Sequence, residues 1–213
     1  APTKETGWDT VLQEAKAAGI PVIIVDRMIE VVDEGLFACW IGSDFRKEGD
    51  TAVAWMERYF GGQPIRIVHL QGNSGSTAQI GRTAGLDAGL RNNQNWTLLA
   101  RESGEFTQAK GQEVMESFLE RFSDIDVVYS ENDNMAYGII DALKAKGLQP
   151  GRDVTVISFD ANRTALEMTL EGLISLNVEC NPLHGPRVRD IIEQLEAGQT
   201  PQKFTYVEET VFD

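Results

Sequence analysis

Short apolar runs alternate with longer stretches of helical periodicity through most of this chain. The short runs are rich in Val and Ile and stop at polar residues, whereas the longer stretches repeat apolar residues at intervals of three and four. The pattern predicts strands at 65–70, 96–100, 125–129 and 154–159, each followed by a helix, and these helices end near 92, 122, 147 and 172. Strands that alternate with helices of this length indicate a parallel sheet with helices on both faces, in fold class α/β.

The two ends of the chain are less regular. Before the four units, the pattern predicts a helix that ends at Gly19, a strand at 21–25, an acidic turn at 30–34, a strand at 36–41 and a helix at 45–60. After them it predicts a strand at 173–178, a helix at 186–197 and one last strand at 204–212. We expect Ala52, Val53, Met56 and Tyr59 to point inward from the helix at 45–60.

Composition and charge exclude several classes of protein. The chain has 213 residues, enough for one large domain or two small ones, and no apolar run approaches the roughly 20 residues of a membrane span. Its net charge of −14 repels phosphate backbones, so we expect no nucleic-acid partner and no direct membrane insertion. Two cysteines are too few for a disulfide framework, and we expect Cys39 and Cys180 to be free thiols.

Polar residues gather where the predicted strands end. The clearest case is the strand before Ser130, which is followed by Glu131, Asn132, Asp133 and Asn134 at the start of a helix. In parallel α/β sheets ligands bind beyond the carboxyl ends of the strands. Asn and Asp are also favoured helix N-caps, so capping is the alternative interpretation of these side chains.

The other junctions carry similar chemistry. Amides, carboxylates and guanidinium groups suit a polyhydroxylated ligand, because each hydroxyl donates and accepts hydrogen bonds, and an aromatic ring covers the apolar side of a sugar. Each residue alone has another interpretation: a carboxylate can cap a helix, an aromatic ring can belong to the core, and an arginine can form a surface ion pair. The candidate binding residues are Asp26, Arg27, Gln71, Arg82, Phe106, Asn132, Asp133, Asp160 and Glu179.

Other chemistries have less support. The turn at 72–75 follows a strand but lacks the spacing of a phosphate-binding loop, and the chain has no G-x-S-x-G nucleophile elbow. His69 and His184 are too far apart in the sequence to form the paired motif of a zinc site. We therefore expect no catalytic residue, no metal site and no cofactor.

Five motifs carry a family resemblance: VDR at 25–27, LQGNSGSTAQIGR at 70–82, SGEF at 103–106, ENDNMA at 131–136 and ISFD at 157–160. Together they resemble the type I periplasmic sugar-binding proteins, the ribose- and galactose-binding class of solute receptors of ABC importers. Segments 104–118 and 178–182 are most similar to the galactofuranose-binding receptors of this class. The resemblance covers essentially the whole chain.

The resemblance implies a site and a domain organisation. Asp26 and Arg27 would bind sugar hydroxyls from an N-terminal lobe; Arg82, Asn132 and Asp160 would do so from a C-terminal lobe, with Phe106 stacked on the ring. Glu179 would contact the ligand at a crossover, whereas Asp133 would be either a contact or a helix cap. Asp160 is followed by Ala161 where the family usually has Gly, which would shift that loop.

The same resemblance implies a periplasmic-binding-protein-like I fold with a complete C-terminal lobe and a partial N-terminal lobe. With crossings near 43–44, 179 and 208–209, the expected segments are 1–43 and 180–207 in the N-terminal lobe, 44–179 in the C-terminal lobe and 208–213 as a final crossover strand. The opening strands and helices of the family are absent, so we expect an N-terminally truncated form.

The resulting hypothesis is a periplasmic or other extracytoplasmic receptor that is monomeric and breaks no bond. It would capture a monosaccharide between two hinged lobes and deliver it to the permease subunits of an ABC sugar importer. The sugar-effector domain of a LacI-type repressor, which shares this fold, is the alternative. A sugar-processing enzyme is a third hypothesis, for which the sequence offers no nucleophile–base pair.

Overall fold

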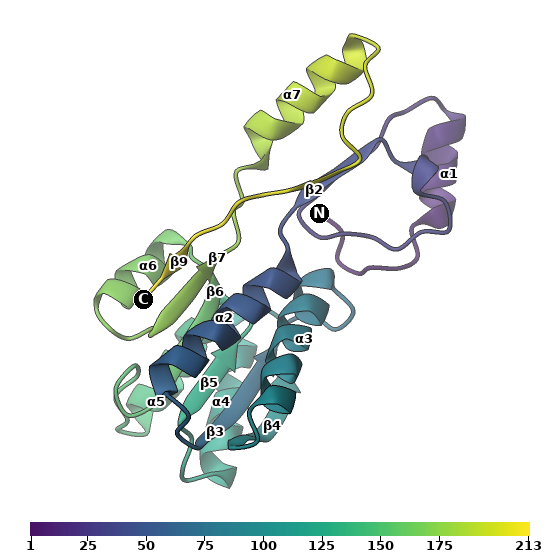
Figure 1. The fold of residues 1–213 in the computed structure, drawn as a ribbon. Coiled ribbons are helices and arrows are strands. Elements are labelled where there is room, and N and C mark those ends of the chain that lie inside the picture. Colours follow the sequence, from purple (N-terminus) through teal and green to yellow (C-terminus); the bar gives the residue numbers. More distant parts are fainter. The chain divides into compact units, whose positions relative to one another are not determined.

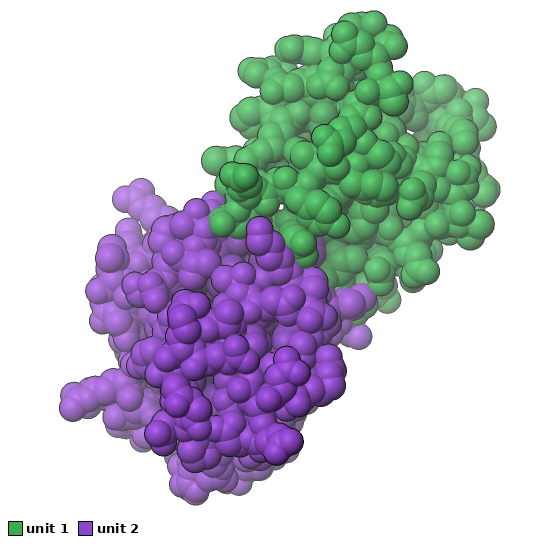
Figure 2. All heavy atoms as spheres, in the orientation of Figure 1, with its two compact units in different colours: residues 1–44, 75–77, 181–209 green, residues 45–74, 78–180, 210–213 purple.

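The computed structural model describes residues 1–213 and forms two compact units, each with its own sheet. Unit 1 comprises residues 1–44, 75–77 and 181–209, and unit 2 comprises residues 45–74, 78–180 and 210–213 (Figure 2). All strand pairs are parallel except the last pair of unit 2. The predicted α/β class, with mainly parallel sheets flanked by helices, is therefore confirmed.

Unit 2 is built on a six-stranded sheet of order β4-β3-β5-β6-β7-β9. Its strands are β3 (Ile65–Gln71), β4 (Trp96–Ser103), β5 (Val127–Ser130), β6 (Thr155–Asp160), β7 (Leu176–Glu179) and β9 (Val211–Phe212). The chain moves outward to β4 and then returns to place β5 on the other side of β3. Such a reversal is the position at which open α/β sheets bind ligands, beyond the carboxyl ends of the strands.

Helices cover both faces of this sheet (Figure 1). Helices α2 (Phe45–Phe60) and α3 (Thr77–Asn92) lie on one face, and α4 (Gln108–Arg121), α5 (Asp133–Ala145) and α6 (Arg163–Leu170) lie on the other. Successive strand residues alternate between the two cores: Val68 and Val128 pack with α4 and α5, whereas Ile67 and Tyr129 pack with α2 and α3. Burial on both faces explains why these strands are continuous apolar runs.

A stripe of glycines brings α2 and α3 close together. Gly81, Gly85 and Gly89 recur at every fourth residue of α3 and face α2. A Cβ atom at Gly85 would lie 2.4 Å from the carbonyl carbon of Gly49 on α2, so neither backbone could approach the other if a side chain stood there. This close approach brings the side chains of α2 next to the polar edge of the sheet.

Unit 1 contains a three-stranded parallel sheet of order β1-β2-β8. Its elements are α1 (Asp9–Ala17), β1 (Ile23–Val25), the 3₁₀ helix η1 (Glu34–Leu36), β2 (Cys39–Gly42), α7 (His184–Glu196) and β8 (Phe204–Tyr206). Its core is small and consists of Leu12, Ile29, Leu36, Phe37 and Trp40. No residue of α7 is fully buried.

Three sequence predictions about these elements are wrong. The strand expected at 36–41 begins only at Cys39, because Leu36 belongs to the short helix η1, which Asp33 caps. Tyr59 is 56% exposed and stacks on Trp55 at a centroid distance of 4.5 Å instead of pointing inward. The single strand expected at 204–212 is two strands, β8 in unit 1 and β9 in unit 2, with residues 207–210 between them.

Two further observations bear on the class of protein. No helix combines the length and the apolar character that a membrane crossing needs. Cys39 is buried in unit 1, Cys180 is half-buried in unit 2, and neither forms a disulfide.

Candidate functional site

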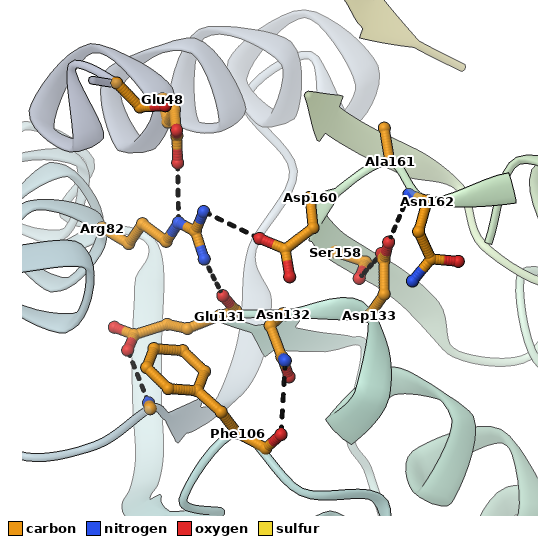
Figure 3. Close-up of polar contacts among 12 residues, drawn as sticks. Glu48, Arg82, Phe106, Glu131, Asn132, Asp133, Ser158, Asp160, Ala161 and Asn162 are labelled. Carbon is orange, nitrogen blue, oxygen red and sulfur yellow. Dashed lines mark hydrogen bonds and ion pairs between the residues drawn. The ribbon is translucent and has the colours of Figure 1, made fainter. Parts of the chain in front are cut away.

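Arg82 is the centre of a polar cluster at the carboxyl edge of the unit 2 sheet (Figure 3). Its side chain is 2% exposed, and its Nε donates to Glu48 at 2.6 Å while Nη2 donates to Asp160 at 3.0 Å. Nη1 donates to the backbone carbonyl of Glu131. The guanidinium carbon also lies 4.9 Å from the centroid of the Phe159 ring. Arg82 is therefore a buried residue that binds groups from three other segments, and not a surface ion-pair partner.

The two carboxylates keep this buried arginine charged. Burial alone disfavours the charged form, but Glu48 and Asp160 outweigh that effect and hold the pKa of Arg82 well above its ordinary value. Asp160 is 37% exposed, whereas Glu48 and Arg82 are each 2% exposed. The exposed end of the charged network is therefore the carboxylate of Asp160.

Backbone strain marks the loops that carry the predicted site residues. The non-glycine residues with left-handed φ are Asp26, Glu105, Phe106, Asp160 and Ala161. All five lie at or just after the ends of strands β1, β4 and β6. Each such residue costs about 1–3 kcal/mol, and strain of this kind persists mainly at ligand-binding and catalytic loops. Three of the five are predicted binding residues.

The ring of Phe106 lies close to the backbone of Gly72. A Cβ atom at Gly72 would lie 1.9 Å from Cζ of the ring, so only glycine allows this contact. The ring is partly buried and packs at the border of the core below α4 and α5. Its backbone carbonyl accepts a hydrogen bond of 3.4 Å from Nδ2 of Asn132. Phe106 is thus held in place by both the turn after β3 and the junction after β5.

Asn132 caps helix α5, as the capping interpretation predicted. Its Oδ1 accepts a hydrogen bond of 2.9 Å from the backbone nitrogen of Met135, and the residue is 5% exposed. Its amide nitrogen is the group that reaches Phe106. Asn132 therefore joins the end of β5 to the loop after β4.

Asp133 is fully buried and is not the cap of its helix. Its Oδ1 accepts from Ser158 at 2.7 Å and from Asn177 at 2.8 Å, and its Oδ2 accepts from the backbone nitrogen of Asn162 at 2.8 Å. Burial, followed by the negative charge of Asp160, raises the pKa of Asp133 to about 7. Because three internal donors occupy this carboxylate, the geometry favours a structural role over contact with a ligand.

Glu131 and His69 form a second buried polar network, which adjoins Arg82 through the backbone carbonyl of Glu131. Glu131 is fully buried, and its Oε1 accepts from Thr83 at 2.6 Å while its Oε2 accepts from the backbone nitrogen of Gly72 at 2.7 Å. Nε of Arg101 donates to Nδ1 of His69 at 2.8 Å, so the proton of this imidazole is on Nε2, which lies 2.9 Å from Oε1 of Glu131. Position 131 has the parity of Val127 and Tyr129, which face α2 and α3, and that parity is the signal for its contact with Thr83 of α3.

The remaining predicted residues lie elsewhere. Asp26 and Arg27 follow β1 in unit 1, where their side chains are 26% and 25% exposed and their charged groups are 4.0 Å apart. Glu179 pairs with Asp160 in the β6–β7 register, and its carboxylate accepts from the backbone nitrogen of Thr210 at 2.8 Å. Gln71 donates to Thr83 at 2.7 Å. Unit 2 thus brings Arg82, Phe106, Asn132, Asp133 and Asp160 together, with Glu179 beside Asp160.

The chain matches known proteins over most or all of its length. A model of the periplasmic binding protein domain matches residues 1–183. The chain belongs to this family. It is 35% identical to the galactofuranose-binding protein YtfQ of Escherichia coli (strain K12), over 100% of this chain and 68% of the relative. The resemblance to sugar-binding receptors of ABC importers is therefore confirmed.

Two solved structures extend the likeness. The binding component of the arabinose ABC transporter from Shewanella sp. ANA-3, bound to α- and β-L-arabinofuranose, matches with a TM-score of 0.95 and 40% identity. A Mycobacterium smegmatis protein in complex with β-D-fucofuranose matches with a TM-score of 0.96 and 37% identity. Both matches cover 100% of this chain and, respectively, 71% and 70% of the other. These relatives are sugar-binding proteins, which favours the receptor over the repressor domain and over an enzyme.

Proposed function

We propose that this chain is the monosaccharide-binding part of a periplasmic solute-binding protein, which delivers its sugar to the permease subunits of an ABC importer. The observation that carries the proposal is the Arg82–Asp160 pair, in which a buried guanidinium holds a partly exposed carboxylate at the ligand-binding edge of a parallel sheet. We infer that the protein acts as a monomer and as a receptor, not as an enzyme.

The proposed contacts follow from the chemistry of each group. The Asp160 carboxylate accepts hydrogen bonds from sugar hydroxyls, each contributing about 1.5–3 kcal/mol because the acceptor is charged. The Phe106 ring offers an apolar face to the C–H side of the sugar, and Asn132 offers an amide. In unit 1, Asp26 carries the strained backbone expected of a binding loop, with Arg27 beside it. We include Glu179 among the proposed contacts because it pairs with Asp160 in the β6–β7 register.

The sugar is proposed to be a furanose. The relatives reported above are named for galactofuranose or were solved with arabinofuranose or fucofuranose, and this chain is 35–40% identical to them. A five-membered ring presents its hydroxyls at angles different from those of a pyranose, so carboxylates fixed by buried partners distinguish the two forms.

Isothermal titration calorimetry with L-arabinose, D-galactose, D-ribose and their methyl furanosides tests this proposal. We expect saturable binding of at least one furanose and no conversion of any sugar. Asp160→Asn should weaken binding by at least about tenfold, which corresponds to one lost charge-assisted hydrogen bond. Asp141→Asn, at an exposed position of α5, is the matched control and should leave binding unchanged. Absence of binding to every sugar, or turnover of any of them, would refute the proposal.

A further inference from the structure

The turn that presents Asp160 contains two successive residues in left-handed conformations. Asp160 has φ 102° and Ala161 has φ 54°, and neither is glycine. An L-residue in this region is strained, and Ala has no polar side chain with which to stabilise itself there. Something outside the turn must therefore hold it in this conformation.

Two fully buried side chains hold the backbone of this turn. The backbone nitrogen of Ala161 donates to Oδ1 of Asn177 on β7 at 3.0 Å. The next nitrogen, that of Asn162, donates to Oδ2 of Asp133 on α5 at 2.8 Å (Figure 3). Asn177 and Asp133 are each 0% exposed. Two consecutive N–H groups of the strained turn are thus fixed by groups from two different elements.

The two holding groups also fix each other. Nδ2 of Asn177 donates to Oδ1 of Asp133 at 2.8 Å, and the hydroxyl of Ser158 donates to the same oxygen at 2.7 Å. Because the backbone N–H of Ala161 can only donate, the amide of Asn177 turns its oxygen toward Ala161 and its nitrogen toward Asp133. The hydrogen bond from Nδ2 to Asp133 holds Asn177 in this orientation.

We propose that Asp133 and Asn177 are positioning residues that hold the 160–162 turn in its left-handed conformation and so keep the Asp160 carboxylate beside Arg82, ready for the sugar. This inference rests on the proposed function. Without the two side chains, the turn relaxes toward ordinary φ values, and the carboxylate of Asp160 leaves its place at 3.0 Å from Arg82.

The decisive experiment combines a loss and a rescue. Asn177→Ala removes the acceptor for the Ala161 nitrogen and should weaken binding of the best methyl furanoside by about tenfold or more. Ala161→Gly adds a residue that adopts left-handed φ freely, so the double variant should recover most of that affinity. The matched control is Asn93→Ala, which removes a side chain with two hydrogen bonds, at 2.8 and 2.9 Å, at the far end of α3. If Asn177 had a purely structural role, both asparagine variants would have a lower melting temperature, and Ala161→Gly would not restore the affinity of Asn177→Ala.

A second measurement does not need the sugar. Amide hydrogen exchange at Ala161 and Asn162 should be at least about tenfold faster in Asn177→Ala than in Asn93→Ala, because the open turn exposes these N–H groups. Should no sugar bind the unchanged protein, the proposed function fails while this comparison still decides whether the two residues hold the turn. Equal exchange rates in the two variants would overturn the inference. So would a double variant that still binds the sugar but recovers none of the affinity lost in Asn177→Ala.

A third variant covers the case in which Asn177→Ala does not fold. Ala161→Gly alone should raise the melting temperature, because it relieves the strain that Asp133 and Asn177 otherwise hold. An unchanged or lower melting temperature would show that the turn stores no strain and would overturn the inference as well.

Discussion

Glu48 and Arg82 form an ion pair at 2.6 Å in which each side chain is only 2% exposed. The pair exists because the glycine stripe on α3 lets α2 approach closely enough for Glu48 to reach the guanidinium. Replacing both partners of such a pair by apolar residues often leaves the stability unchanged or higher. Removing one partner is strongly destabilising, because it leaves an uncompensated buried charge. The arrangement therefore ties the stability of unit 2 to the same arginine that holds Asp160.

Removal of Glu48 should be strongly destabilising. We expect Glu48→Ala to lower the free energy of unfolding by about 3–5 kcal/mol, since Arg82 is left with one carboxylate in place of two. Arg58→Ala, at an exposed position of the same helix, is the control and should change it by less than about 0.5 kcal/mol. Urea denaturation monitored by circular dichroism measures both. Equal effects of the two substitutions would show that the buried pair is not required.

The contact between Gly72 and Phe106 predicts a specific effect on binding. Gly72→Ala places a methyl group 1.9 Å from the ring, so the ring must move and binding of a sugar should weaken. We expect a loss of stability of about 1–3 kcal/mol, as for other overpacked sites. Gly185→Ala on α7 is the matched control, because its added methyl group meets nothing within 4 Å. Unchanged affinity in Gly72→Ala would remove Phe106 from the proposed site.

The raised pKa of Asp133 predicts how stability depends on pH. This carboxyl titrates near 3.8 in the unfolded chain and near 7 in the folded protein, so between these values the folded state binds the extra proton. Its contribution to stability is therefore complete below about pH 4 and is lost as the pH rises toward 7. The charged or titratable groups that face it are Asp160 and Tyr137.

Comparison with a variant that cannot titrate isolates this effect. The free energy of unfolding of the unchanged protein, minus that of Asp133→Asn, should fall between pH 4.5 and 7 with a slope of at most about 1.4 kcal/mol per pH unit. Above pH 8 the difference should be constant. A difference that stays level across the whole range would mean that Asp133 is already ionised at low pH in the folded protein.

The two cysteines should differ in reactivity. Cys39 is buried, and burial raises the pKa of its thiol, which lowers the fraction of reactive thiolate. Cys180 is half-buried. We expect a thiol reagent to modify Cys180 first in the native protein and both residues after denaturation, as measured by mass spectrometry of the intact chain. Modification of neither residue after denaturation without reductant would contradict the free thiols.

Much of the fold is predictable from local signals, and the failures have physical causes. The bounds of α2 follow from its periodicity and from Gly61 and Gly62, which take left-handed φ just beyond its end. The break between β8 and β9 has no such signal, because no glycine or proline stands where the chain passes from one unit to the other. Periodicity describes the faces of an element and does not report which sheet it joins.

The site shows the same division. Residues at or just after strand ends, such as Asn132 and Asp160, can be found from the sequence because topology alone brings the strand ends of one parallel sheet to one edge. Glu48 could not, since one acidic residue on an amphipathic helix resembles its exposed neighbours until the partner helix is known. Asn177 lies inside a strand and reaches the site only through Asp133 and Ala161, a relation that exists in three dimensions alone.

The indole of Trp40 donates from Nε1 to the backbone carbonyl of Asp26 at 3.0 Å, and the ring packs edge-on against Tyr206 at a centroid distance of 5.1 Å. Indole emission responds to the hydrogen bond at this nitrogen, so the protein contains its own optical reporter of the strained loop after β1. Because the chain has four tryptophans, the difference between the emission of the unchanged chain and that of Trp40→Phe isolates the contribution of Trp40 and so reports on the Asp26 loop without any attached dye.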